Sequence, residues 1–217
     1  MWMLLWACAP SPVLRDVPLF AGGAPTPEIE LGGARFELSA LTFEVADLRL
    51  YAPAQVSWFQ NLGTARAHPG HDNAGDVLGE LLGNWELDLL ADPALLGEAQ
   101  VYSGELAQLT FTARTARLVG HRTLGGQVLG FDLSLDLEEE EISGVPLSFE
   151  LSPEGAVPTL TLLGHALAML ELSLIEVAMD TDGDGSLTLT DSSLANSLPY
   201  ALLSTLSWSA SAQSEEP

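Results

Sequence analysis

The chain has 217 residues, of which 47% are hydrophobic, so it is long enough and apolar enough to bury a sizeable core. Its 30 acidic residues face 7 basic residues, all of them Arg, and the formal net charge is −23. Such a charge repels phosphate backbones and anionic lipid surfaces, which argues against a nucleic-acid partner and favours divalent cations. The same excess of acid can also serve only to keep an apolar domain in solution.

The chain opens with the uncharged sequence MWMLLWAC, which contains the single cysteine, Cys8. This start resembles the end of a bacterial lipoprotein signal, in which Leu5, Trp6 and Ala7 precede a cysteine that is cleaved and lipidated. The resemblance implies a signal-peptide remnant at residues 1–8. It also implies a location in the cell envelope, in the periplasm or at the cell surface, with membrane contact through the lipid anchor only. A secreted or periplasmic protein and a cytosolic chain with an apolar tail remain open.

Residues 9–27 are rich in proline and glycine and are predicted to form a flexible linker. From there on, apolar residues alternate with polar ones, as in half-buried β-strands. Within residues 41–50 (LTFEVADLRL) the alternation changes parity at Ala46 and Asp47, which predicts a strand with a β-bulge. Residues 61–76 are rich in Gly, Asn, Asp and Pro and are predicted to be a loop.

Further alternating segments predict strands at 85–89, 109–113, 131–137, 145–151 and 157–163. The sequence EEEISG, which separates the third from the fourth, is predicted to be a solvated, hairpin-like connection. Many short strands separated by turn signals argue for a mainly β fold. We therefore expect an antiparallel β-sandwich with a C-terminal calcium loop and short helices, in a single domain at 28–208.

The C-terminal part has a different pattern. Residues 165–179 carry leucines at helical spacing, although a strand remains open there. A second helix is predicted to start at Asp191 or Ser192 and to kink or end early at Pro199. The tail, residues 209–217, has no core-forming side chains and is predicted to be disordered.

The sequence DTDGDGSLTLTD at 180–191 carries the clearest chemical signal. Aspartates stand at its positions 1, 3 and 5, and Gly185 follows at position 6, where a sharp turn lets the side chains converge on one centre. Leu187 is expected to tie this loop to the core. The loop resembles the calcium loop of EF-hand and dockerin-type proteins, with Asp instead of Glu at position 12. The resemblance implies calcium as cofactor, with these ligands: Asp180, Asp182, Asp184, Ser186, Thr188 and Asp191. The alternative interpretation is that this sequence forms an Asp- and Gly-rich turn that binds no metal.

The four histidines, His68, His71, His121 and His165, form a second, speculative metal site. The first two have HxxH spacing near aspartates, which suits zinc or copper, and the other two complete the set if strand ends meet at one pole. The four can equally be unrelated residues at loops and strand ends.

The sequence shows no nucleophile elbow, metalloprotease, phosphate-loop or dinucleotide signature, so we predict that the protein is not an enzyme. The expected function is that of a cell-envelope lipoprotein that binds calcium in a structural or ligand-binding role. Two alternatives stay open: a periplasmic copper- or zinc-binding protein that uses the histidines, and a carbohydrate-binding module in which Trp58 and Trp85 stack on sugars. The sequence itself identifies no protein or glycan partner.

Overall fold

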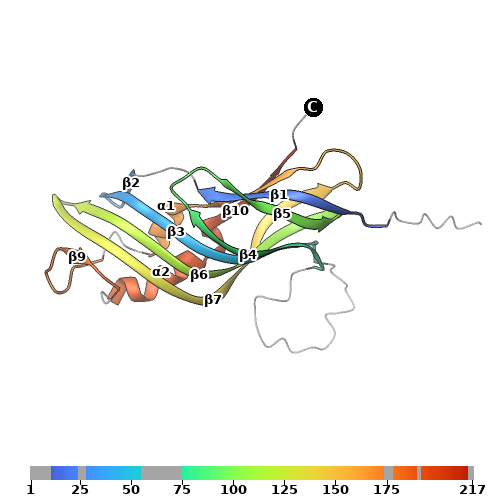
Figure 1. Ribbon diagram of the computed structural model, residues 1–217. Helices are drawn as coiled ribbons and strands as arrows, with labels where there is room; N and C mark the ends of the chain where they lie inside the picture. Colours follow the sequence, from blue (N-terminus) through green and yellow to red (C-terminus); the bar gives the residue numbers. More distant parts are fainter. Residues whose placement is uncertain (1–10, 24–27, 55–74, 174–177, 190–191, 215–217) are drawn as a thin grey trace, which may run out of the picture.

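The computed structural model describes residues 11–23, 28–54, 75–173, 178–189 and 192–214 (Figure 1). The expected mainly β fold with short helices is confirmed. Its strands are β1 (Leu14–Gly23), β2 (Glu28–Leu31), β3 (Ala34–Tyr51), β4 (Val77–Asp88), β5 (Ala94–Tyr102), β6 (Gly104–Leu124), β7 (Gln127–Leu151), β8 (Thr159–Gly164), β9 (Ser186–Leu187) and β10 (Trp208–Gln213). The helices are α1 (Ala166–Ser173), α2 (Ser192–Leu203) and the short 3-10 helix η2 (Thr205–Ser207).

The ten strands form one sheet, in which nine follow the order β10-β8-β1-β5-β4-β3-β6-β7-β9 and β2 lies off this path, paired with β3. The join between β4 and β5 is short, since these two long strands pair at two positions only. On either side of this join the sheet forms two layers, since Trp208 of β10 packs edge-on against Phe43 of β3 and Phe111 of β6, with ring centroids 5.2 and 4.8 Å apart. The sandwich is therefore one folded sheet. It is mixed, because β1 with β8 and β7 with β9 are parallel pairs.

The predicted bulge in the first long strand is confirmed. The pairing of β3 with β4 shifts register between Ala46 and Leu48, and Asp47 between them has a φ of 50°. The shift lets Val45 and Leu48 both point into the core, where each is at most 1% exposed. One extra residue thus explains the change of parity in the sequence.

The hairpin predicted at EEEISG is wrong, because β7 continues through this sequence as one strand. Glu138 and Glu139 take left-handed conformations, with φ of 55° and 58°. At this point the pairing with β6 shifts register between Ala113 and Thr115. The additional residues are absorbed as a bulge, so the strand keeps its direction and its partner.

The flexible linker predicted at 9–27 is wrong over residues 14–23, which form β1 inside the sheet, while residues 9, 10 and 24–27 lie outside the described residues. Val17, Leu19 and Ala21 alternate and are each at most 3% exposed. Pro18 lacks an N–H group, but the pairing of β1 with β8 begins only at Leu19, so the strand tolerates the proline there.

The C-terminal tail is shorter than predicted. Residues 209–213 belong to β10, which pairs with β8. The first residue of β10, Trp208, is buried in the core at 3% exposure. The Ser and Ala residues that follow Trp208 are small, so the sequence shows no alternation of large apolar and polar side chains that would predict this strand. Residue 214 carries no strand, and residues 215–217 lie outside the described residues.

The two predicted helices are confirmed as α1 and α2, which pack against each other. In α2 the residues Leu194, Leu198 and Leu202 are each at most 1% exposed, as their spacing predicts. Of the two outcomes expected at Pro199, a kink or an early end, the early end is wrong, because α2 continues to Leu203. Burial of the leucine face on both sides of the proline offsets the hydrogen bond that the ring removes. Within the described part of the chain, neither helix has the length and hydropathy that crossing a bilayer requires.

Candidate metal site

The acidic loop is attached to the sheet at both of its ends. Upstream, the carbonyl oxygen of Ala178 accepts a hydrogen bond of 2.6 Å from Nη1 of Arg122 on β6. Downstream, β9 runs parallel to β7, and its residue Leu187 is 1% exposed, which confirms the tie to the core. A backbone hydrogen bond from Gly130 to the carbonyl oxygen of Gly185, 3.2 Å long, extends this pairing into the loop. The loop is therefore held at fixed positions on two neighbouring strands.

Arg122 is the residue of this site that sequence reasoning missed. It is 5% exposed, and burial lowers the pKa of its guanidinium. An arginine stays charged despite such a shift, so a positive charge lies buried beneath the entry to the acidic loop. The only signal in the sequence is that Arg122 stands in an otherwise alternating strand. That signal does not identify Ala178 as its partner.

Inside the loop, Asp180 organises the backbone. Its Oδ1 accepts a hydrogen bond from the N–H of Gly183 at 2.7 Å, and its Oδ2 accepts one from the N–H of Gly185 at 2.8 Å. The two glycines have φ of 77° and 86°, a left-handed conformation that glycine adopts without the strain of a side chain. The turn expected at Gly185 is confirmed, and it wraps the chain around the Asp180 carboxylate.

Asp182 and Asp184 complete the cluster. Oδ1 of Asp182 accepts from the N–H of Asp184 at 3.2 Å, and Oδ1 of Asp184 accepts from the N–H of Ser186 at 2.8 Å. One carboxylate oxygen from each of the three aspartates lies within 4.8 Å of the other two. An ionised carboxylate has about four lone-pair sites, so each aspartate retains acceptor capacity after these bonds are made.

The pKa values of Asp180 and Asp182 are shifted in opposite directions. The pKa of Asp180 is lowered, chiefly by the hydrogen bond from the Gly185 N–H. For Asp182 the N–H of Asp184 is the largest single influence and lowers the pKa. The contact with Asp180, desolvation and the neighbouring negative charges outweigh it, so that the pKa of Asp182 is raised. None of the ion pairs between described residues involves these aspartates. A cation at their centre would remove the repulsion that Asp182 experiences.

The other expected calcium ligands are placed less fully. Ser186 begins β9 and Thr188 follows it, and both are half-buried directly after the cluster. Asp191 lies outside the described residues. The structure thus brings three of the expected ligands together. Two more, Ser186 and Thr188, follow them directly along the chain. An open cleft of about 520 Å³ borders the loop at Asp180 and Gly183, and it gives solvent access to the carboxylates.

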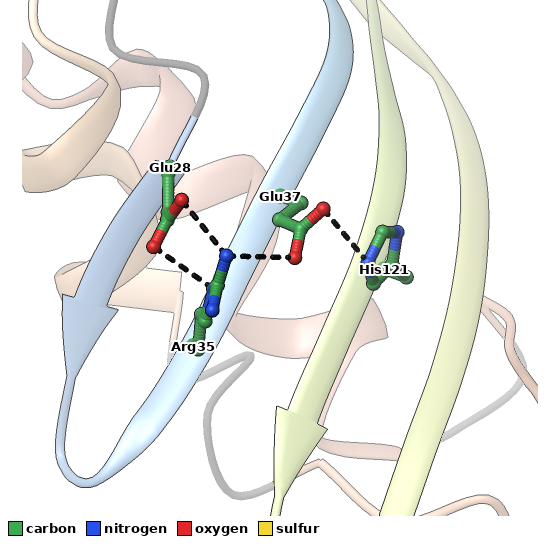
Figure 2. A network of polar contacts seen from close by, with 4 residues as sticks. All are labelled: Glu28, Arg35, Glu37 and His121. Carbon is green, nitrogen blue, oxygen red and sulfur yellow. Dashed lines mark hydrogen bonds and ion pairs between the residues drawn. The ribbon is translucent and has the colours of Figure 1, made fainter.

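Of the four histidines of the second candidate site, the structure describes two, His121 and His165. His121 on β6 places Nε2 3.3 Å from Oε2 of Glu37, which also pairs with Arg35, and Arg35 in turn pairs with Glu28 (Figure 2). Among the described residues, only the three aspartates form a group of three or more metal-ligating side chains. His121 therefore belongs to an exposed charge ladder across β2, β3 and β6.

His165 makes a contact of its own. His165 precedes α1, and its Nε2 lies 2.8 Å from Oγ of Ser209 on β10. His68 and His71 lie outside the described residues, as does Trp58. Trp85 is half-buried, and its Nε1 donates a 3.1 Å hydrogen bond to the carbonyl oxygen of Leu96, so the indole joins β4 to β5 across their short pairing.

No protein-family model, no curated protein and no solved structure matches this chain. The chemistry of the site therefore rests on its own donor set. That set consists of oxygen atoms, carries a net negative charge and is open to solvent, which suits a hard divalent cation better than a soft transition metal.

Proposed function

We propose that the chain binds one calcium ion in the loop at 180–191 and that the ion fastens the C-terminal segment to the sheet. The observation that carries the proposal is the convergence of three carboxylate oxygens within 4.8 Å of one another, in a loop already bent around Asp180. Hydrogen bonds from the backbone orient the carboxylates before any ion arrives. Such preorganisation lowers the cost of collecting like charges.

Calcium is favoured over other cations by the ligand chemistry. Zinc and copper prefer nitrogen and sulfur ligands, whereas this loop offers carboxylate, hydroxyl and backbone oxygens. Magnesium demands near-ideal octahedral geometry and gives up its water reluctantly. Calcium accepts a larger and more irregular set of oxygens, which a short loop of alternating aspartates supplies.

The proposed role is structural rather than catalytic. Without an ion, three carboxylates lie together in the segment that precedes α2. The contact with Asp180 and burial raise the pKa of Asp182, and repulsion by the neighbouring negative charges adds to this rise. Two positive charges from calcium offset this repulsion. Leu187 then transmits the ordering of the loop to the core, in which it is buried.

We further propose that Cys8 is lipidated, which places the protein in the cell envelope with its membrane contact made through the anchor. The support is the apolar MWMLLWAC start. The matching test is labelling of cells with radioactive palmitate, which should mark the wild-type chain and leave Cys8→Ser unlabelled.

Isothermal titration calorimetry with calcium tests the metal proposal. The wild type should bind about one ion per chain, and Asp182→Asn should bind at least tenfold more weakly, because it removes one charged ligand. Asp92→Asn, an exposed aspartate before Pro93 in the turn between β4 and β5, is the matched control and should bind as the wild type does. Equal binding by wild type and Asp182→Asn, or no heat at millimolar calcium, would refute the proposal.

A further inference from the structure

An open cleft of about 440 Å³ lies on the outer face of the layer formed by β1, β8 and β10. The pairing shows which side chains share this face. Phe20 of β1 pairs with Thr161 of β8, and Thr161 pairs with Ser211 of β10. The neighbours of Thr161 along β8, Leu160 and Leu162, point the other way into the core, where each is at most 2% exposed. Phe20, Thr161 and Ser211 therefore form one row across the outer face, and all three line the cleft.

Further residues of the same face line the cleft. Thr159 and Leu163 lie two residues to either side of Thr161, so they share its face, and Thr159 pairs with Gln213 of β10. The side chains of β1 and β8 in the cleft, from Phe20 to Leu163, are half-buried, whereas that of Gln213 is exposed. The inner part of the cleft thus combines an aromatic ring and a leucine with two threonine hydroxyls.

The turn between β4 and β5 forms a wall of the cleft. The N–H of Gly23 donates to the carbonyl oxygen of Ala91 at 3.1 Å, which fixes this turn to β1. A Cβ atom at Gly22 would lie 2.8 Å from Cα of Pro93, closer than such contacts come, so glycine is needed for the turn to lie against the strand. Asp92 and Pro93, which line the cleft, are thereby held beside the sheet.

The lining offers free hydrogen-bonding groups and little charge. Among the described residues, the side chains of Thr161, Ser211 and Gln213 have no hydrogen-bond partner, so their donors and acceptors are available to a ligand. Asp92 is the only charged side chain that the described residues contribute to the lining, and none of them contributes a basic one. Together with the net charge of −23, this disfavours an anionic ligand.

We propose that this cleft binds a neutral saccharide. A pyranose ring has apolar C–H groups on its faces and hydroxyl groups around its edge. Phe20 and Leu163 offer an apolar surface to such a face, and the polar groups of Thr161, Ser211 and Gln213 exchange hydrogen bonds with the edge. A wholly apolar ligand would leave these polar groups without partners. The volume of about 440 Å³ lies in the range of small-molecule sites, roughly 300–1,000 Å³.

An array of neutral, sialylated and sulfated oligosaccharides tests the proposed ligand class on the full chain. The protein should bind at least one neutral saccharide and leave the acidic ones unbound. Failure to bind any neutral saccharide, or preference for the acidic ones, would overturn the inference. None of the described residues of the calcium loop lines the cleft, so this result and the calcium titration stand or fall separately.

Calorimetric titration of variants with the neutral saccharide that the array identifies tests the location. Phe20→Leu keeps an apolar side chain but removes the aromatic face, and Thr161→Val removes a hydroxyl group at nearly constant size. Both should bind the saccharide severalfold more weakly than the wild type. Thr123→Val, which changes a half-buried threonine of β6 outside the cleft, is the matched control and should bind as the wild type does.

Wild-type affinity in both cleft variants would overturn the proposed location, because the saccharide would then bind elsewhere. Urea unfolding establishes that each variant is folded before it is titrated. If Phe20→Leu does not fold, Thr161→Val and Ser211→Ala decide the question, since both alter only a small polar group on the surface of the sheet.

Discussion

Shortening Leu187 to alanine tests whether attachment of the loop to the core controls the metal site. Replacing a buried leucine by alanine costs about 2–5 kcal/mol. β9 has two residues and ends the strand path, so its surroundings can partly close the cavity, and the lower part of that range, about 2–3 kcal/mol, is expected. This cost falls on docking of the loop. At about 1.4 kcal/mol per factor of ten, calcium affinity should fall by up to about 100-fold.

The assay compares calcium titrations and urea unfolding of Leu187→Ala with those of Leu162→Ala. Leu162 is fully buried in β8, outside the loop and the strands that hold it. The control should lose stability of the same order and keep wild-type calcium affinity. If Leu187→Ala is also destabilised but binds calcium as the wild type does, the loop does not depend on its attachment, and the reasoning is refuted.

Three further predictions concern the bulge, the cluster and the C-terminal strand. Glu138→Gly and Glu139→Gly should each be more stable to urea than the corresponding alanine variants, by roughly 0.5–1 kcal/mol, because both positions have left-handed φ; equal stabilities would contradict the bulge. As the pH is lowered, calcium affinity should already begin to fall at a pH above the ordinary pKa of an aspartate. The reason is that the pKa of Asp182 is raised, so Asp182 is the first of the cluster to take up a proton. Asp180, whose pKa is lowered, keeps its charge to lower pH, and a fall that starts only below the ordinary pKa would contradict this order. Trp208→Ala should lower the free energy of unfolding by about 3–5 kcal/mol, since it removes a buried ring and two edge-on contacts; a loss below about 1 kcal/mol would show that β10 is not clamped by this residue.

Sequence reasoning succeeded where a local pattern determines the structure. The parity change around Asp47 predicts its bulge because one additional residue reverses the faces of everything that follows. The aspartate spacing predicts the converging carboxylates because the backbone turn at Gly185 depends on neighbouring residues only.

Sequence reasoning failed where pairing with a strand distant in the sequence determines the local structure. The run at Glu138 and Glu139 suits an exposed connection as well as a bulge, and only the continuous pairing with β6 selects the bulge. Residues 209–213 lack large apolar side chains, so their strand follows from the pairing with β8 and from Trp208. Arg122 could not be assigned because its partner, Ala178, contributes only a backbone carbonyl.

The central claim is that the three aspartates hold calcium together, and a calcium titration followed by two-dimensional NMR of the labelled chain tests it residue by residue. The amide signals of Gly183 and Gly185 report directly, because both N–H groups donate to Asp180. We predict that these signals shift most, while those of Gly125 and Gly126 in the turn between β6 and β7 shift little. Unchanged loop signals at saturating calcium, or larger shifts at the glutamates of the β7 bulge, would contradict the account.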